Sequence, residues 1–270
     1  MIRRQAFALS AFLLAAVSAT AAESPRRIVS ANLCADRLTL ALAEPGRVVA
    51  VSPMAADPTV STVAATAANL AVTRAQVEDI VAFHPDLVVL GAFNAPATGQ
   101  MLESLNIRVH RVGTAESLVA VQTEIRALAA ILGESDRGEA MIAAMLARLA
   151  QLPRFDHRVA AAVYQAGGWS AGRDTLADEL FNRIGLVNIT AAEGRRGFTT
   201  LPLETLVAAA PDLIVIESMG EEKPSLAGAL LHHPALTLRG TQMVTVPMRL
   251  WACPDAALVE AAALIAASVP

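Results

Sequence analysis

VEDIVAFHPDLVVL at residues 77–90 recurs in related form as LETLVAAAPDLIVI at residues 203–216. Glu, Val, Ala, Pro, Asp, Leu and Val occupy the same positions in both copies, which is seven identities in fourteen without a gap. Each copy predicts a short helix, a break at Pro-Asp and a buried strand. Proline disfavours helical geometry in the residue before it, and an unbroken aliphatic run is typical of a parallel strand buried on both faces. The repeat therefore predicts two α/β lobes of similar build.

The rest of the sequence alternates in the same way. Parallel sheets arise when strand patterns alternate with helical patterns of about ten residues. The expected strands are 27–30, 48–52, 87–90 and 108–112 in the first half and 158–164, 213–217 and 243–246 in the second. The expected helices are 33–43, 75–83, 97–105, 175–184, 202–210 and 254–267.

A long helical segment separates the halves. Residues 115–152 are helical in pattern apart from a break at Gly133, after which Ser135 is a good N-cap. The second part, 135–152, would be about 27 Å long. We therefore expect an α/β fold of two lobes, each with a mainly parallel sheet flanked by helices, bridged by one long helix: a first lobe at 23–133, a linking helix at 134–152 and a second lobe at 153–270.

The N-terminus predicts export. Arg3-Arg4 precede an apolar run at 6–17, and Ala19-Thr20-Ala21 is a small-x-small cleavage site. We expect residues 1–22 to be a signal peptide cleaved near residue 21 or 22, by either the Sec or the twin-arginine route, and the mature chain to lie in the periplasm. Beyond it no apolar run is long enough for a membrane span. A net charge of −4 argues against nucleic acid.

Aromatic residues are few, at 4% of the chain, but most of the mature ones lie at strand ends or in the loops beyond. Ligands of α/β sheets bind outside the carboxyl ends of the strands. We therefore expect five rings to form a face for a large, partly apolar ligand, with arginines of the same loops available for an anionic group. The rings are Phe93, Tyr164, Trp169, Phe198 and Trp251; the arginines are Arg74, Arg195, Arg196 and Arg249.

Two other functions compete with ligand capture. The stretch 168–172 fits G-x-S-x-G, so Ser170 is a candidate nucleophile, with Asp212 and His232 or His233 in the required chain order. No oxyanion loop of the His-Gly-Gly type is present, however, and residues 165–168 intervene after the strand, whereas the motif requires its serine at the tip of a strand that runs directly into a helix. A direct zinc or manganese receptor is the third candidate, although the five histidines and two cysteines lack the usual ligand spacings.

Two further pairs have open roles at this point. Glu78 and Glu204 fall in the first turns of the repeated helices, where a carboxylate favours the helix dipole; a functional role would need a partner that touches both lobes. Cys34 and Cys253 are an even pair in an oxidising compartment, which favours a disulfide. Whether the two cysteines meet depends on the fold.

Over nearly the whole mature chain, these residues resemble the periplasmic substrate-binding proteins of ATP-binding-cassette (ABC) importers for vitamin B12 and ferric siderophores. The matching pieces are Arg27–Ser30 with Asn32–Cys34, Glu78 through Leu87, the long helix, Ser170–Gly172, Glu204 through Leu213, and Leu250–Cys253. The chain departs from the B12 receptors at Met54, Val72 and Gly91, where they carry tryptophans and a tyrosine.

The resemblance implies a monomeric binding protein without catalysis, catalytic residues or a cofactor. It would capture an iron-siderophore, corrinoid or haem-type metal chelate between the lobes and deliver it to a permease dimer with its ATPase subunits. Glu78 and Glu204 would dock with arginines of the permease, and Met54 joins the rings and Arg249 as a ligand contact. Both cysteines fall at cleft positions, where an inter-lobe disulfide, two free thiols and a ligand-contacting thiolate are the alternatives.

Overall fold

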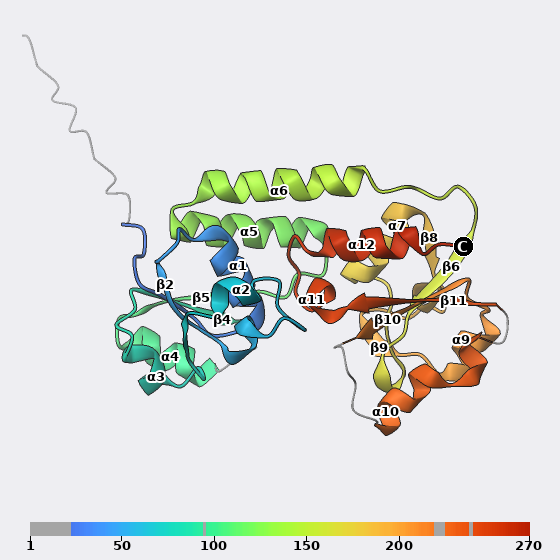
Figure 1. The fold of residues 1–270 in the computed structure, drawn as a ribbon, viewed down its shortest axis with the longest axis horizontal. Coiled ribbons are helices and arrows are strands. Elements are labelled where there is room, and N and C mark those ends of the chain that lie inside the picture. Colours follow the sequence, from blue (N-terminus) through green and yellow to red (C-terminus); the bar gives the residue numbers. More distant parts are fainter. Residues whose placement is uncertain (1–22, 94–95, 219–224, 238–239) are drawn as a thin grey trace, which may run out of the picture.

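The two copies of the repeated pattern form the same unit in two different sheets of the computed structural model (Figure 1). In each copy a short helix, α3 (Val77–Val81) or α9 (Leu203–Ala208), leads to a buried strand, β4 (Leu87–Gly91) or β10 (Leu213–Ser218). The residue before each proline is left-handed with the same φ of 48°. The structure describes residues 23–93, 96–218, 225–237 and 240–270, so the predicted signal peptide lies outside it.

The repeated aspartate gives the unit its position in the sheet. The Asp86 carboxylate accepts hydrogen bonds from the backbone N–H groups of Arg26 and Arg27, at 2.7 and 3.0 Å. The Asp212 carboxylate accepts one from the N–H of Ala160 at 2.7 Å. In both lobes the Pro-Asp break therefore joins the start of the repeated strand, β4 or β10, to the start of its neighbour, β1 or β6, and this explains why the pair recurs with the strand.

The first lobe contains a five-stranded parallel sheet in the order β3-β2-β1-β4-β5. Its remaining strands are β1 (Ile28–Ser30), β2 (Val48–Val51), β3 (Ala71–Val72) and β5 (Arg108–Val112). Its remaining helices are α1 (Leu33–Leu42), α2 (Ala64–Ala67), α4 (Pro96–Ser104) and α5 (Leu118–Leu132), with a 3-10 turn at Pro53–Ala56.

The second lobe contains a four-stranded parallel sheet in the order β11-β10-β6-β8 and an antiparallel pair, β7-β9. Its remaining strands are β6 (Val159–Val163), β7 (Trp169–Ala171), β8 (Leu186–Asn188), β9 (Phe198–Thr200) and β11 (Gln242–Pro247). Its remaining helices are α7 (Leu176–Ile184), α8 (Ile189–Ala192), α10 (Leu226–Ala229), α11 (Met248–Trp251) and α12 (Leu258–Ala267), with 3-10 turns at Ala166–Gly168, Leu230–His232 and Pro234–Thr237.

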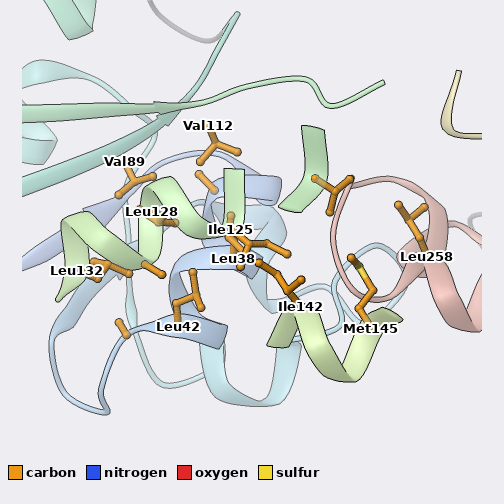
Figure 2. Close-up of a cluster of buried hydrophobic side chains, with 14 of the residues drawn as sticks. Leu38, Leu42, Val89, Val112, Ile125, Leu128, Leu132, Ile142, Met145 and Leu258 are labelled. Carbon is orange, nitrogen blue, oxygen red and sulfur yellow. The ribbon is translucent and has the colours of Figure 1, made fainter. Parts of the chain in front are cut away.

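One helix runs over both lobes. Gly133, with φ +76°, ends α5 in a left-handed cap, and α6 (Ser135–Ala150) follows along the top of Figure 1. Ser135 is the first residue of this helix rather than its cap. Met145 and Ile142 of α6 lie in one buried cluster with Leu258 of α12 and with the first-lobe core (Figure 2). The helix is therefore packed against both lobes along its length.

The predicted α/β class with two parallel sheets is confirmed, and the expected strands match within about two residues at each end. The expected helix at 254–267 begins only at Leu258, because the Asp255 carboxylate accepts a hydrogen bond from the N–H of Ala257 in a tight turn. Strands β3, β7, β8 and β9 were not predicted from the sequence; at two or three residues each they are too short to show a periodic pattern.

We expect Asp212→Ala to lower the free energy of unfolding by about 1–2 kcal/mol, because the N–H of Ala160 loses a charge-assisted acceptor. Asp212→Asn keeps an acceptor oxygen and should lose less. Urea unfolding measures both. Equal losses for Ala and Asn would contradict this role, and Asp79→Ala, an exposed aspartate in α3, is the control.

Candidate ligand-binding site

Three of the predicted first-lobe residues follow the carboxyl ends of strands in the same parallel sheet. Met54 lies in the 3-10 turn after β2, Arg74 follows β3 and Phe93 follows β4. All three are exposed, Met54 to 50% and Phe93 to 81%. Apolar side chains this exposed, at the edge where parallel sheets bind ligands, are candidates for ligand contact.

Trp169 and Phe198 lie in the antiparallel pair of the second lobe. The register pairs Trp169 with Thr200 and Ala171 with Phe198, so the two rings are diagonal neighbours on one face of the pair. Their exposed fractions are 48% and 63%. They form the second lobe's apolar patch.

Arginines border this patch. Arg196 pairs with Asp174 at 2.6 Å on the surface, and Arg173 lies beside Arg196 in an isolated bridge. A Cβ at position 172 would lie 2.4 Å from the carbonyl oxygen of Arg195, so only glycine lets this loop pass so close. The second glycine of the G-x-S-x-G stretch is therefore required by packing.

Ser170 is not placed as a nucleophile. Its side chain is fully buried, and its hydroxyl donates to the carbonyl oxygen of Val163 at 2.6 Å and lies 2.6 Å from Oγ1 of Thr190. Asp212 lies at the amino end of β10 and binds the N–H of Ala160. The hydrolase arrangement expected of these residues is absent from the part of the chain that the structure describes.

Tyr164 departs from the prediction. It is completely buried with Ile189, Leu201 and Ile214 in the second-lobe core. Its N–H continues the sheet by donating to Val215, so strand alternation turns the ring inward. Burial, and secondarily the charge of Glu204, raises the pKa of its phenol. It cannot contact a ligand in this conformation.

Trp251 and Arg249 belong to α11, just beyond β11. The half-buried indole of Trp251 packs against the cores of both lobes. Arg249 is exposed and lines a hollow of about 620 Å³ whose walls come from both lobes. The other charged residues of its lining are Arg148 and Glu260.

A disulfide and an ion pair also join the two lobes, and only the disulfide was among the alternatives that the sequence left open. Cys34 of α1 and Cys253 form a disulfide. One turn further along α1, the Arg37 guanidinium contacts the Asp255 carboxylate through Nη2, at 2.8 Å from each oxygen. Sequence reasoning missed this ion pair; the only available signal was an Asp-Arg dipeptide within an otherwise apolar helix.

Two buried or half-buried carboxyls were also missed. Asp36, fully buried beside Arg37, accepts hydrogen bonds from the N–H and hydroxyl of Ser52 at the carboxyl end of β2. Burial raises its pKa to about 6. At the carboxyl end of β10, Glu217 accepts a hydrogen bond from Gln165 at 2.6 Å, and burial raises the pKa of Glu217.

Glu78 and Glu204 occupy the second residues of α3 and α9, and both are exposed. The repeat thus presents one acid on each lobe. Within the described residues no group of three or more His, Cys, Asp or Glu side chains could hold a metal ion. No helix among those residues is long and apolar enough to cross a membrane.

Two α/β lobes under one long helix, with exposed rings after β4 in the first lobe and on the β7-β9 pair in the second, define a two-lobed ligand receptor. The family model for periplasmic binding protein matches residues 28–241. The chain belongs to this family.

Solved structures share the fold. The apo form of the periplasmic heme-binding protein RhuT from Roseiflexus sp. RS-1 is 24% identical, with a TM-score of 0.74 over 92% of this chain and 100% of that chain. The periplasmic vitamin B12 binding protein BtuF of Vibrio cholerae is 17% identical, with a TM-score of 0.65 over 91% and 96%. An ABC-type Fe3+-hydroxamate transport structure from Saccharomonospora viridis is 19% identical, with a TM-score of 0.69 over 91% and 93%. Comparison with curated proteins yields no match.

The raised pKa of Asp36 predicts how stability depends on pH. Between its ordinary value of 3.8 and about 6, the folded protein holds a proton that the unfolded chain releases, so stability falls as pH rises. Across this range the loss should be about 3 kcal/mol larger in the wild type than in Asp36→Asn.

Urea unfolding of both proteins at pH 4 and pH 7 measures the difference. The exposed Asp156→Asn is the control and should follow the wild type. Parallel curves for the wild type and Asp36→Asn would refute the assignment.

Proposed function

We propose that this protein is the substrate-binding component of an ABC importer and captures a metal chelate between its lobes. The observation that carries the proposal is the placement of exposed apolar side chains on both lobes. Met54 and Phe93 follow the carboxyl ends of β2 and β4 in the first lobe, and Trp169 and Phe198 lie on the β7-β9 pair of the second lobe, where Ser170 of β7 bonds to Val163 at the carboxyl end of β6. A ligand bridging them would be large and partly apolar. The proposal includes no catalytic step and no resident cofactor.

The chelate is of the haem, corrinoid or ferric siderophore class. Structures with this fold are described as binding heme and vitamin B12, and one belongs to an Fe3+-hydroxamate transport system. Two exposed arginines, Arg74 after β3 and Arg249 in the hollow between the lobes, supply positive charge for the acidic groups that such chelates carry. Tyr164 is left out of the contact set because it is buried.

Delivery requires a permease that touches both lobes at once. Glu78 and Glu204 supply an exposed acid on each lobe at equivalent positions of the repeat. We propose that they pair with basic residues of a permease dimer and that the receptor, a monomer exported to the periplasm and cleaved near residue 21 or 22, docks across that dimer.

Ligand capture is tested by titrating the purified protein with hemin, cyanocobalamin and a ferric hydroxamate while Trp fluorescence is recorded. One probe should quench the signal at micromolar or lower concentration. Trp169→Ala and Phe198→Ala should each weaken that probe about tenfold, a loss of about 1.4 kcal/mol. Val119→Ala, which truncates an exposed side chain of α5, should not. Failure of every probe, or equal affinity in all variants, would refute the proposal.

Docking is tested by uptake. Glu78→Ala combined with Glu204→Ala should abolish chelate uptake in cells carrying the cognate importer, with ligand affinity unchanged, because buried charge pairs at an interface are costly to break. Glu44→Ala combined with Asp156→Ala removes one exposed acid from each lobe elsewhere and should leave uptake intact. Normal uptake in the first double variant would exclude the docking role.

A further inference from the structure

One guanidinium joins four segments where the lobes meet. Arg37 is 1% exposed and lies on α1 of the first lobe. Beyond its contacts with Asp255, its Nη1 donates to the carbonyl oxygen of Arg249 at 2.7 Å and lies 3.4 Å from the carbonyl oxygen of Val60. The side chain thus connects α1 and the loop before α2 to the second-lobe turn that carries Arg249 and Trp251.

A buried ion pair in this place contributes little to net stability. Removing two charges from water costs several kcal/mol per ion, and apolar replacements are often neutral or stabilising. The surroundings would accept such a replacement, because Leu33, Val60 and Cys253 form an apolar cluster there. The ion pair instead fixes the orientation of the bound groups, since a planar guanidinium that binds a carboxylate and a carbonyl oxygen permits one geometry.

The disulfide and the ion pair hold different atoms. The disulfide fixes Cys253, which lies two residues beyond Trp251. The ion pair fixes the backbone of Arg249 before Trp251 and the side chain of Asp255 after it. Only the ion pair therefore fixes both sides of the turn, and the indole of Trp251 packs against both cores.

We propose that Arg37 and Asp255 are positioning residues that hold the Arg249–Trp251 turn in its ligand-binding place against the first lobe, whether or not the Cys34–Cys253 disulfide is formed. This inference rests on the proposed function in one respect, the role of the turn in binding. It predicts that the turn leaves its place against the first lobe when the ion pair is lost, and that the turn stays there when the disulfide is lost.

Trp251 reports on the turn without any ligand. The chain has two tryptophans, so Trp169→Phe leaves Trp251 as the single emitter in the full-length mature protein. Arg37→Met with Asp255→Asn removes the ion pair without leaving a buried unpaired charge, and Asn keeps an acceptor for the N–H of Ala257. Acrylamide quenching of Trp251 should rise about twofold in this variant.

Two controls isolate the effect. Cys34→Ser with Cys253→Ser should leave the quenching of Trp251 unchanged. Arg47→Met with Glu134→Gln removes a similar inner pair of the first lobe, in which Arg47 also binds the carbonyl oxygens of Pro25 and Leu132. This control loses stability without contact to the turn and should also leave Trp251 unchanged.

The same variants, with Trp169 retained, are titrated with hemin, cyanocobalamin and a ferric hydroxamate. The probe that binds the wild type should bind the ion-pair variant about tenfold more weakly, and it should bind both controls as tightly as it binds the wild type.

Two outcomes overturn the inference: quenching of Trp251 in the ion-pair variant equal to that in the Arg47 control, or increased quenching of Trp251 on loss of the disulfide alone. If no probe binds the wild type, the proposed function fails, and the Trp251 measurement still decides the positioning role. Should the ion-pair variant not fold, Arg37→Lys, which keeps the charge and loses the two-point contact, replaces it with the same readouts.

Discussion

The structure depends on burying the apolar stripe of α6 against both lobes. Ile142, Met145 and Leu149 of this helix are buried in a cluster that extends from β1 of the first lobe to α12 of the second. Burial of each such side chain contributes about 1.5–3 kcal/mol, and a shared core resists the hinge motions that a flexible linker would permit. The distance between the two sheets, and so the space available to a ligand, follows from this packing.

Apolar contacts hold the two lobes close together, and the ion pair of Arg37 with Asp255 fixes how the second-lobe turn is oriented against the first lobe. Hydrophobic packing is non-directional, whereas a guanidinium that binds a carboxylate and a carbonyl oxygen fixes orientation. A receptor that meets its ligand with residues from both lobes needs both properties. The chain separates them: aliphatic side chains set the spacing, and a few buried polar groups set the geometry of the turns at the strand ends.

The fold could be predicted from the sequence because its signals are local and repeated. The Pro-Asp break and the aliphatic run after it specify a strand start wherever they occur, and the structure shows the physical reason in the aspartate's hydrogen bonds to the neighbouring strand. The site was harder. Phe93 and Trp169 are exposed, whereas Tyr164 is buried, because along the strand its ring falls on the same side as Ala160 and Ala162 and so faces the core. Arg37 and Asp255 are 218 residues apart, and no local pattern records such a contact.

Capture between two lobes is the central claim, and hydrogen exchange measured by mass spectrometry on the mature protein, with and without the probe that binds, tests it most directly. We expect simultaneous protection of backbone amides at 52–56, 72–74 and 91–93 in the first lobe and at 168–172, 196–200 and 248–252 in the second. Protection confined to one lobe, with the other exchanging as in the free protein, would contradict the account.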